Sequence, residues 1–211
     1  MAAHTGKRRF GTVCALLGAA LACTGSARAG EVSEEQIAKV LTAASSGRMT
    51  RSLTLSPAEA ARKEEEDRFI KSVRNRVTRS LTMDEREKIA AITETKQERI
   101  DLEINFDSNS AVINAHAMPL AVKLGNALSK PEFKNRVFVI ASHTDAKGSV
   151  PFNQDLSERR AEAIKRFLVE KDHIEPSQLV TVGYGKTKLK DVQNPFSSEN
   201  RRVQIVNVAD K

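Results

Sequence analysis

The apolar run at residues 137–141, Val-Phe-Val-Ile-Ala, constrains the fold of this chain more than any other feature. A continuous run predicts a strand that is covered on both faces, because a strand with one wet face alternates apolar and polar side chains. Residues 100–106 do alternate in that way and predict a half-buried strand. Residues 179–184 and 203–208 are two further strand-like segments.

Two amphipathic helices are expected between these strands. One covers about residues 118–128, with Pro119 in its first turn and an apolar face formed by Val122, Leu124 and Leu128. The other covers about residues 153–171, and its core stripe is Leu156, Ala163, Ile164, Phe167 and Leu168. The alternation predicts an α/β fold, a two-layer sandwich with helices on one face of a mixed β-sheet. A helical or flexible segment precedes it.

The first 29 residues have the features of an export signal. Lys7, Arg8 and Arg9 are followed by an uncharged apolar stretch at residues 10–24, and residues 27–29 offer a small-x-small cleavage pattern. We therefore predict a signal peptide over residues 1–29. Two alternatives are an uncleaved anchor, although the stretch is shorter than the roughly 20 residues that span a bilayer, and lipid attachment at Cys23, which follows half of a lipobox.

Processing would change the chemistry that the chain can offer. Both cysteines, Cys14 and Cys23, lie in the predicted signal, so the processed chain would have no disulfide, thiol nucleophile or thiolate metal site. The signal also holds four basic residues, so 34 − 4 = 30 basic against 27 acidic residues leave a charge of +3. This small charge of mixed signs gives no support for a nucleic-acid partner.

Residues 30–99 form a charged helical or linker segment that contains a repeat. The sequence RMTRSLTL at residues 48–55 recurs as RVTRSLTM at residues 76–83, so both copies share TRSLT. Each copy leads into a capping box, at residues 56–59 and 82–85. Two copies are too few for a solenoid. Two interpretations stay open: a linker of solvated helices, or a pair of docking motifs for a protein partner.

Residues 100–211 carry five short motifs in a fixed order. They are Phe106-Asp107, His143-Thr144-Asp145, Asn153 with Leu156-Ser157 and Arg160-Ala161, Gly183-Tyr184-Gly185, and Asn200-Arg201-Arg202-Val203. In this order and spacing the region resembles the OmpA C-terminal-like (peptidoglycan-binding) domain family. The resemblance implies helices on one face of a mixed sheet and non-covalent binding of the diaminopimelate in the peptidoglycan stem peptide. It also implies a periplasmic protein of a Gram-negative cell envelope, with association with the outer membrane as an open alternative.

The resemblance assigns peptidoglycan-binding roles to five residues: Asp145, Asn153, Leu156, Arg160 and Arg202. Diaminopimelate carries an ammonium and a carboxylate on one carbon, so Asp145 would take the ammonium and Arg160 the carboxylate, through two parallel hydrogen bonds. Asn153 would meet the peptide at the start of its helix. Leu156 and Arg160 follow it at helical spacing on the same face. Arg202 would approach from the last strand.

Structural roles remain open for the same residues. Asn153 also suits a helix cap, Leu156 a core position, and Asp145 and Arg160 a salt bridge with each other. The chain departs from the family at two places. Ser142 stands where the family usually has glycine, and Lys186-Thr187-Lys188-Leu189 replaces Glu-x-x-Pro, which adds positive charge beside the site.

An enzyme is the competing class of function. His116, His143 and His173 form no HExxH pair, and Ser157 lacks the glycines of a nucleophile elbow. We therefore predict a binding protein that is not an enzyme, with no catalytic residue, metal or cofactor. A further alternative is an envelope scaffold that acts mainly through a protein partner on residues 48–83.

Overall fold

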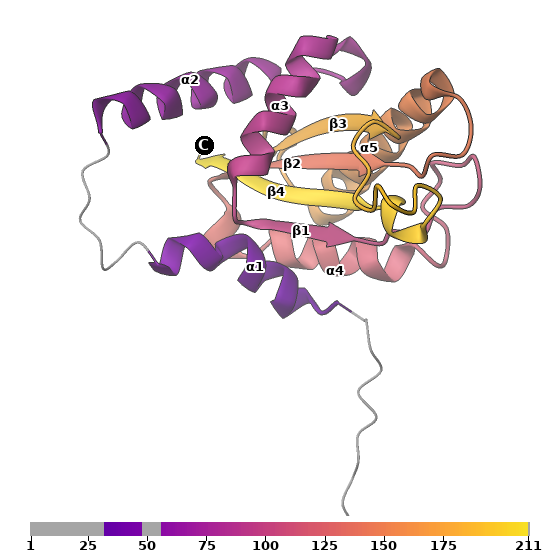
Figure 1. Ribbon diagram of the computed structural model, residues 1–211. Coiled ribbons are helices and arrows are strands. Elements are labelled where there is room, and N and C mark those ends of the chain that lie inside the picture. The colour runs from indigo at the N-terminus through magenta and orange to yellow at the C-terminus, as the bar shows by residue number, and fades with distance from the viewer. Residues whose placement is uncertain (1–31, 48–55, 211) are drawn as a thin grey trace, which may run out of the picture. The chain divides into compact units, whose positions relative to one another are not determined.

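The computed structural model describes residues 32–47 and 56–210 and shows a mixed sheet of four strands (Figure 1). The strands are β1 (Arg99–Leu102), β2 (Arg136–His143), β3 (Leu179–Gly185) and β4 (Val203–Asp210), in the order β1-β4-β2-β3. Strand β2 runs parallel to β3 and antiparallel to β4, which also pairs antiparallel with β1. The predicted α/β fold with a mixed sheet is confirmed. The predicted signal peptide and the first copy of the repeat lie outside the described residues.

Three helices cover one face of this sheet: α1 (Glu34–Gly47), α4 (Met118–Leu128) and α5 (Val150–Asp172). Helix α5 lies against β2 and β3 and contributes the buried side chains Ala161, Ile164 and Leu168 to the core on this face. Phe138 and Ile140 of β2 point into the same core. The helices of residues 100–211 thus cover one face, as predicted.

The other face of the sheet is covered by α2 (Pro57–Val73) and α3 (Met83–Thr95) (Figure 1). Ile70 of α2 and Ile89 of α3 are almost fully buried in a second core, together with Val137 and Val139 of β2. The run at residues 137–141 is therefore covered on both faces, because its alternate side chains enter two different cores. The helices that follow each copy of the repeat supply this second cover. The chain from Val32 onward forms one compact unit.

Local capping chemistry fixes where these two helices begin. Ser56 accepts a hydrogen bond from the backbone N–H of Glu59, whose carboxylate accepts one from the backbone of Ser56. Thr82 and Glu85 form the same reciprocal pair at the start of α3. Both predicted capping boxes are confirmed.

Three predicted boundaries or faces differ from the structure. Strand β1 ends at Leu102, not at Phe106, because the N–H groups of Ile104 and Phe106 bond to carbonyls two residues back and turn the chain away from β4. Helix α5 begins at Val150, since Ser149 caps it. Val122 is 40% exposed and does not belong to the buried face of α4. Within residues 32–47 and 56–210, none of the helices is long and apolar enough to cross a membrane.

Candidate functional site

A small crevice lies where β2 ends and β4 begins. The pairing of Ser142 with Val203 brings the end of β2 beside Arg202, whose carbonyl accepts a hydrogen bond from the backbone of His143 at 3.0 Å. The crevice has a volume of about 20 Å³, and its lining includes Ser142, His143, Arg160, Arg201 and Arg202. Of the five predicted site residues, Arg160 and Arg202 therefore line it directly.

Arg160 is a nearly buried cation that two backbone carbonyls hold in place. Its Nε donates to the carbonyl of Ser110 at 2.9 Å and its Nη2 to that of Asp107 at 3.1 Å. The guanidinium lies 5.0 Å from the centre of the Phe106 ring. Burial and the charge of Arg201 lower the pKa of Arg160 to about 10, although Asp145 opposes this shift. The guanidinium thus remains protonated at neutral pH, with N–H donors beyond those two.

Asp145 pairs with an arginine that the sequence did not single out. Its Oδ2 accepts a hydrogen bond from Nη1 of Arg201 at 2.9 Å, and its Oδ1 accepts one from the backbone of Lys147 at 3.0 Å. The salt bridge that the sequence left open between Asp145 and Arg160 is thus formed with Arg201 instead. Arg201 stands in the fifth motif, but the sequence gave it no role, since its partner Asp145 lies 56 positions away.

Asn153 and Leu156 are buried within α5, with exposures of 2% and 4%. Asn153 does not cap the helix, since Ser149 does; its Nδ2 donates to the carbonyl of Lys147 at 2.9 Å. This bond fastens the loop that carries Asp145 to the helix. The structure thus gives Asn153 a positioning role and leaves Leu156 among the buried side chains.

Arg202 is 8% exposed and faces a carboxylate on β1. Its Nη2 donates to the carbonyl of Lys188 at 3.3 Å, and its Nε lies 3.7 Å from Oδ1 of Asp101. Burial lowers the pKa of Arg202, and Asp101 opposes this. Burial would raise the pKa of Asp101, but hydrogen bonds from Gln204 and Lys190 and the charge of Arg202 hold it below its usual value. The pair fixes the strand end beneath the crevice.

Unpaired polar atoms and a neutral imidazole complete the lining. His143 is 4% exposed and its ring centre lies 5.3 Å from that of Tyr184. Burial and the charge of Arg202 lower the pKa of His143 to about 3, so the imidazole is neutral. Within the described part of the chain, Ser142 Oγ and Arg202 Nη1 are buried without a hydrogen-bond partner. Buried polar atoms normally have partners, so these two are available to a ligand or to water.

The lysines that replace the usual family sequence after Gly185 are engaged in the fold. Lys186 Nζ donates to the carbonyl of Gly148 at 2.7 Å and so helps to hold the loop that carries Asp145. Lys188 Nζ lies 3.0 Å from a carboxylate oxygen of Glu87, and Lys190 Nζ lies 3.1 Å from one of Asp101. The added charge is therefore partly neutralised by the chain's own acids.

The fold and the crevice define an α/β domain with two nearly buried arginines at the meeting point of two strands. Residues 105–202 match the model of the OmpA family. The chain is 32% identical over 108 residues to outer membrane porin F of Pseudomonas fluorescens, a match that covers 50% of this chain and 32% of the relative. It is 35% identical over 101 residues to the peptidoglycan-associated lipoprotein of Mesorhizobium japonicum, which covers 47% of this chain and 58% of the relative.

Among solved structures, the peptidoglycan-associated lipoprotein from Burkholderia pseudomallei is similar, with 27% identity and a TM-score of 0.41. That match covers 50% of this chain and 87% of the solved chain. The chain thus spans only 32% and 58% of the lengths of the two relatives above.

Proposed function

We propose that this protein binds peptidoglycan non-covalently, through the diaminopimelate of the stem peptide, and acts as an adaptor or tether of the cell envelope. The OmpA-family match over residues 105–202 supports this, as do relatives whose names describe peptidoglycan-associated lipoproteins. The binding role carries no chemical step, so the protein acts without a catalytic residue. Export by the predicted signal peptide would bring it to the periplasm, associated with the outer membrane.

The observation that supports the proposal is a pair of opposite charges on separate elements: Arg160 lines the crevice, and Asp145 is paired with Arg201, which also lines it. Arg160 extends from α5 and is held by backbone carbonyls, while Asp145 sits on the loop between β2 and α5. A ligand carboxylate would accept hydrogen bonds from Arg160, whose planar group suits two parallel bonds. The ligand ammonium would bind Asp145.

A ligand ammonium can bind Asp145 only if the ion pair between Arg201 and Asp145 breaks. The Arg201 side chain is 48% exposed, and that of Asp145 is 16% exposed. Because the Arg201 half of the pair is open to solvent, the pair is screened by water and contributes about 0–1 kcal/mol, so replacing Arg201 by a ligand ammonium costs little. Before binding, Arg201 thus occupies the position on Asp145 that the ligand ammonium would take, and its ion pair holds the Asp145 loop.

The alternative role, an envelope scaffold working through residues 48–83, gains less support. In the second copy of the repeat, Thr78 is fully buried and Leu81 is 3% exposed, both within the chain's own fold. Those side chains therefore pack internally, which leaves the outward-facing residues of this copy for any partner.

Co-sedimentation of residues 30–211 with purified diaminopimelate-type cell walls tests the proposal. We compare the wild type with Asp145→Asn and Arg160→Gln. The matched controls are Asp84→Asn in α3 and Arg68→Gln in α2, which make the same chemical changes at exposed positions. Circular dichroism and urea unfolding confirm that each variant is folded.

We expect both crevice variants to lose binding and both controls to retain it. Walls with lysine in place of diaminopimelate should bind weakly, because they lack the carboxylate that Arg160 would take. Wild-type binding that survives both crevice substitutions would refute the proposed site. The absence of wild-type binding would refute the function.

A further inference from the structure

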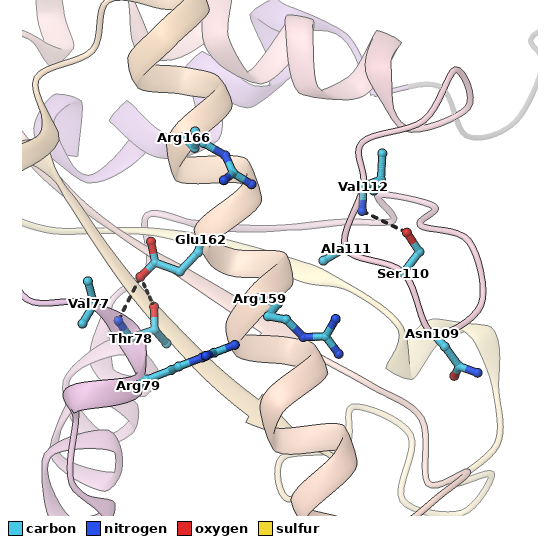
Figure 2. A pocket seen from close by; sticks show the side chains of 10 residues that line it. All are labelled: Val77, Thr78, Arg79, Asn109, Ser110, Ala111, Val112, Arg159, Glu162 and Arg166. Atoms are coloured by element: carbon cyan, nitrogen blue, oxygen red, sulfur yellow. Dashed lines mark hydrogen bonds between the residues drawn. The ribbon is translucent and has the colours of Figure 1, made fainter.

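A second cavity, of about 730 Å³, opens over α5 (Figure 2). Its lining includes Arg159 and Arg166 of α5 and Arg79 of the short helix η2 (Thr78–Ser80), and we call it the arginine groove. In the view of Figure 2, the η2 residues lie on one side of α5 and the loop at residues 109–112 lies on the other. Ligand-binding pockets have volumes of roughly 300–1,000 Å³, so the groove has room for a ligand.

The arginines of α5 are spread along the groove. Arg159, Glu162 and Arg166 share one face of the helix, because they follow one another at spacings of three and four residues. A helix rises by about 1.5 Å per residue, so Arg159 and Arg166 lie about 10 Å apart along its axis. This spacing suits a ligand with two separate anionic groups better than a single phosphate, which needs donors that converge on it.

The three arginines are available to an incoming anion. Arg79 and Arg159 share Asp155, at 3.2 Å and 2.8 Å, and their side chains are 63% and 38% exposed. Ion pairs that are open to water in this way contribute about 0–1 kcal/mol, so a ligand carboxylate can replace Asp155 at little cost. Arg166 is exposed and has no ion pair within the described part of the chain.

The acidic residue of the lining, Glu162, is bonded to η2. Its Oε1 accepts hydrogen bonds from the backbone N–H of Thr78 at 2.8 Å and from the Thr78 hydroxyl at 2.6 Å (Figure 2). Burial would raise the pKa of Glu162, but these bonds and one from Thr181 hold it below its usual value. Three arginines against this one carboxylate give the lining a charge of 3 − 1 = +2.

Aliphatic side chains flank the arginines on both sides of α5. Val77, beside η2, is 63% exposed, and Val112, in the loop on the other side, is 68% exposed (Figure 2). Covering them with apolar groups is favourable, because it removes apolar surface from water. A peptide can supply aliphatic and acidic groups together, so the lining favours a protein segment over an inorganic anion. Val77 and Arg79 are outward-facing residues of the second copy of the repeat.

The polyproline II conformation of a peptide matches this arrangement. It has three residues per turn and rises about 3.1 Å per residue, so side chains three positions apart face the same way and lie about 9 Å apart. That distance is close to the axial separation of Arg159 and Arg166. The two side chains in between point to either side, where Val77 and Val112 lie (Figure 2).

We propose that the arginine groove binds an extended acidic segment of a partner protein, with two carboxylates three residues apart and aliphatic side chains between them. The groove is separate from the crevice and gives the chain a second binding surface. The acidic run of this chain itself, at residues 64–67, is a poor occupant because it is helical and already paired. Glu65 lies 2.7 Å from Lys88, and Glu66 lies 3.1 Å from Lys96.

Calorimetry with capped octapeptides tests the groove. The acidic peptide has glutamates at its third and sixth positions and valines between them. One comparison peptide has glutamines in place of the glutamates, and the other has the same composition with the two glutamates adjacent. The proteins are residues 30–211 of the wild type, Arg79→Gln, Arg166→Gln, Val112→Ser and, as a matched control at an exposed position of α2, Arg68→Gln.

We expect the wild type and Arg68→Gln to bind the acidic peptide about tenfold more tightly than either comparison peptide, the value of one hydrogen bond to a charged group. Arg79→Gln and Arg166→Gln should each weaken binding of the acidic peptide by about tenfold. Val112→Ser should weaken it by about fourfold, the value of one buried methylene group. Arg79→Gln and Arg166→Gln should still co-sediment with cell walls, because neither residue lines the crevice.

Equal affinity for the peptides with spaced and adjacent glutamates would overturn the proposal, because the groove would then respond to charge alone. Absence of binding at millimolar peptide, or binding that Arg79→Gln and Arg166→Gln leave unchanged, would also overturn it. Sedimentation velocity tests the remaining occupant. Self-association of the wild type that Arg166→Gln abolishes would make a second copy of this chain the occupant and would contradict a separate partner.

Discussion

The hydroxyl of Thr78 attaches the second copy of the repeat to the sheet, so Thr78→Val should destabilise the whole unit. Thr78 is fully buried, and its Oγ1 lies 2.6 Å from both Oε1 of Glu162 and Oγ1 of Thr181. Valine has nearly the same shape but cannot donate or accept a hydrogen bond. The substitution therefore isolates the polar contribution.

The expected cost follows from what remains after the hydroxyl is removed. A hydrogen bond to a charged group contributes about 1.5–3 kcal/mol. Glu162 still accepts from the backbone of Thr78 at 2.8 Å and from Thr181 at 3.0 Å, so its carboxylate is not left unpaired. We therefore expect Thr78→Val to lower the free energy of unfolding by about 1.5–2 kcal/mol, the lower end of that range. Thr78→Ser keeps the hydroxyl and removes one buried methyl group, which should cost about 0.8 kcal/mol.

Urea unfolding at pH 7 measures these differences from the midpoint, provided that the m-value is unchanged. A double-mutant cycle with Glu162→Gln should give a coupling of about 1 kcal/mol between residues 78 and 162. Thr95→Val is the matched control, because the Thr95 hydroxyl bonds only within α3, to the carbonyl of Ile92. It should show no coupling to residue 162. If Thr78→Ser costs more than Thr78→Val, packing rather than hydrogen bonding holds this segment, and the reasoning is refuted.

Two further predictions concern the buried imidazole and the glycines. The pKa of His143 is about 3 in the folded state, below its usual 6.5, so its contribution to stability is present above pH 6.5 and declines as the pH falls toward 3. His143→Asn should flatten the decline in unfolding free energy between about pH 6 and 4, and an unchanged slope would contradict this. A Cβ on Gly183 would lie 2.6 Å from the backbone N of Glu158, whereas one on Gly125 would meet only the movable Asp172 carboxylate at 2.1 Å. Gly183→Ala should therefore cost about 1–3 kcal/mol and lower the Tm more than Gly125→Ala, and the reverse order would contradict the packing.

Part of the site could be predicted from the sequence because short local motifs carry several of its residues. The motifs around Asp145, Arg160 and Arg202 predicted which region carries the site, and Arg160 and Arg202 do line one crevice. Their roles toward diaminopimelate stay predictions. Arg201 was missed, since its bond to Asp145 joins residues that are 56 positions apart. The positioning role of Asn153 was missed because α5 begins at Val150, before its apolar stripe. Asn153 therefore lies inside the helix and does not cap it.

The existence of the four strands, the two capping boxes and the need to cover residues 137–141 on both faces could all be inferred from the residues alone. These features depend on side-chain periodicity and on hydrogen bonds between near neighbours, which the order of residues specifies directly. The packing of distant segments is what makes α2 and α3 the second cover and brings η2, α5 and the loop at residues 109–112 around one open cavity. Such arrangements depend on how distant surfaces fit together, and periodicity reports which face of an element is buried but not what buries it.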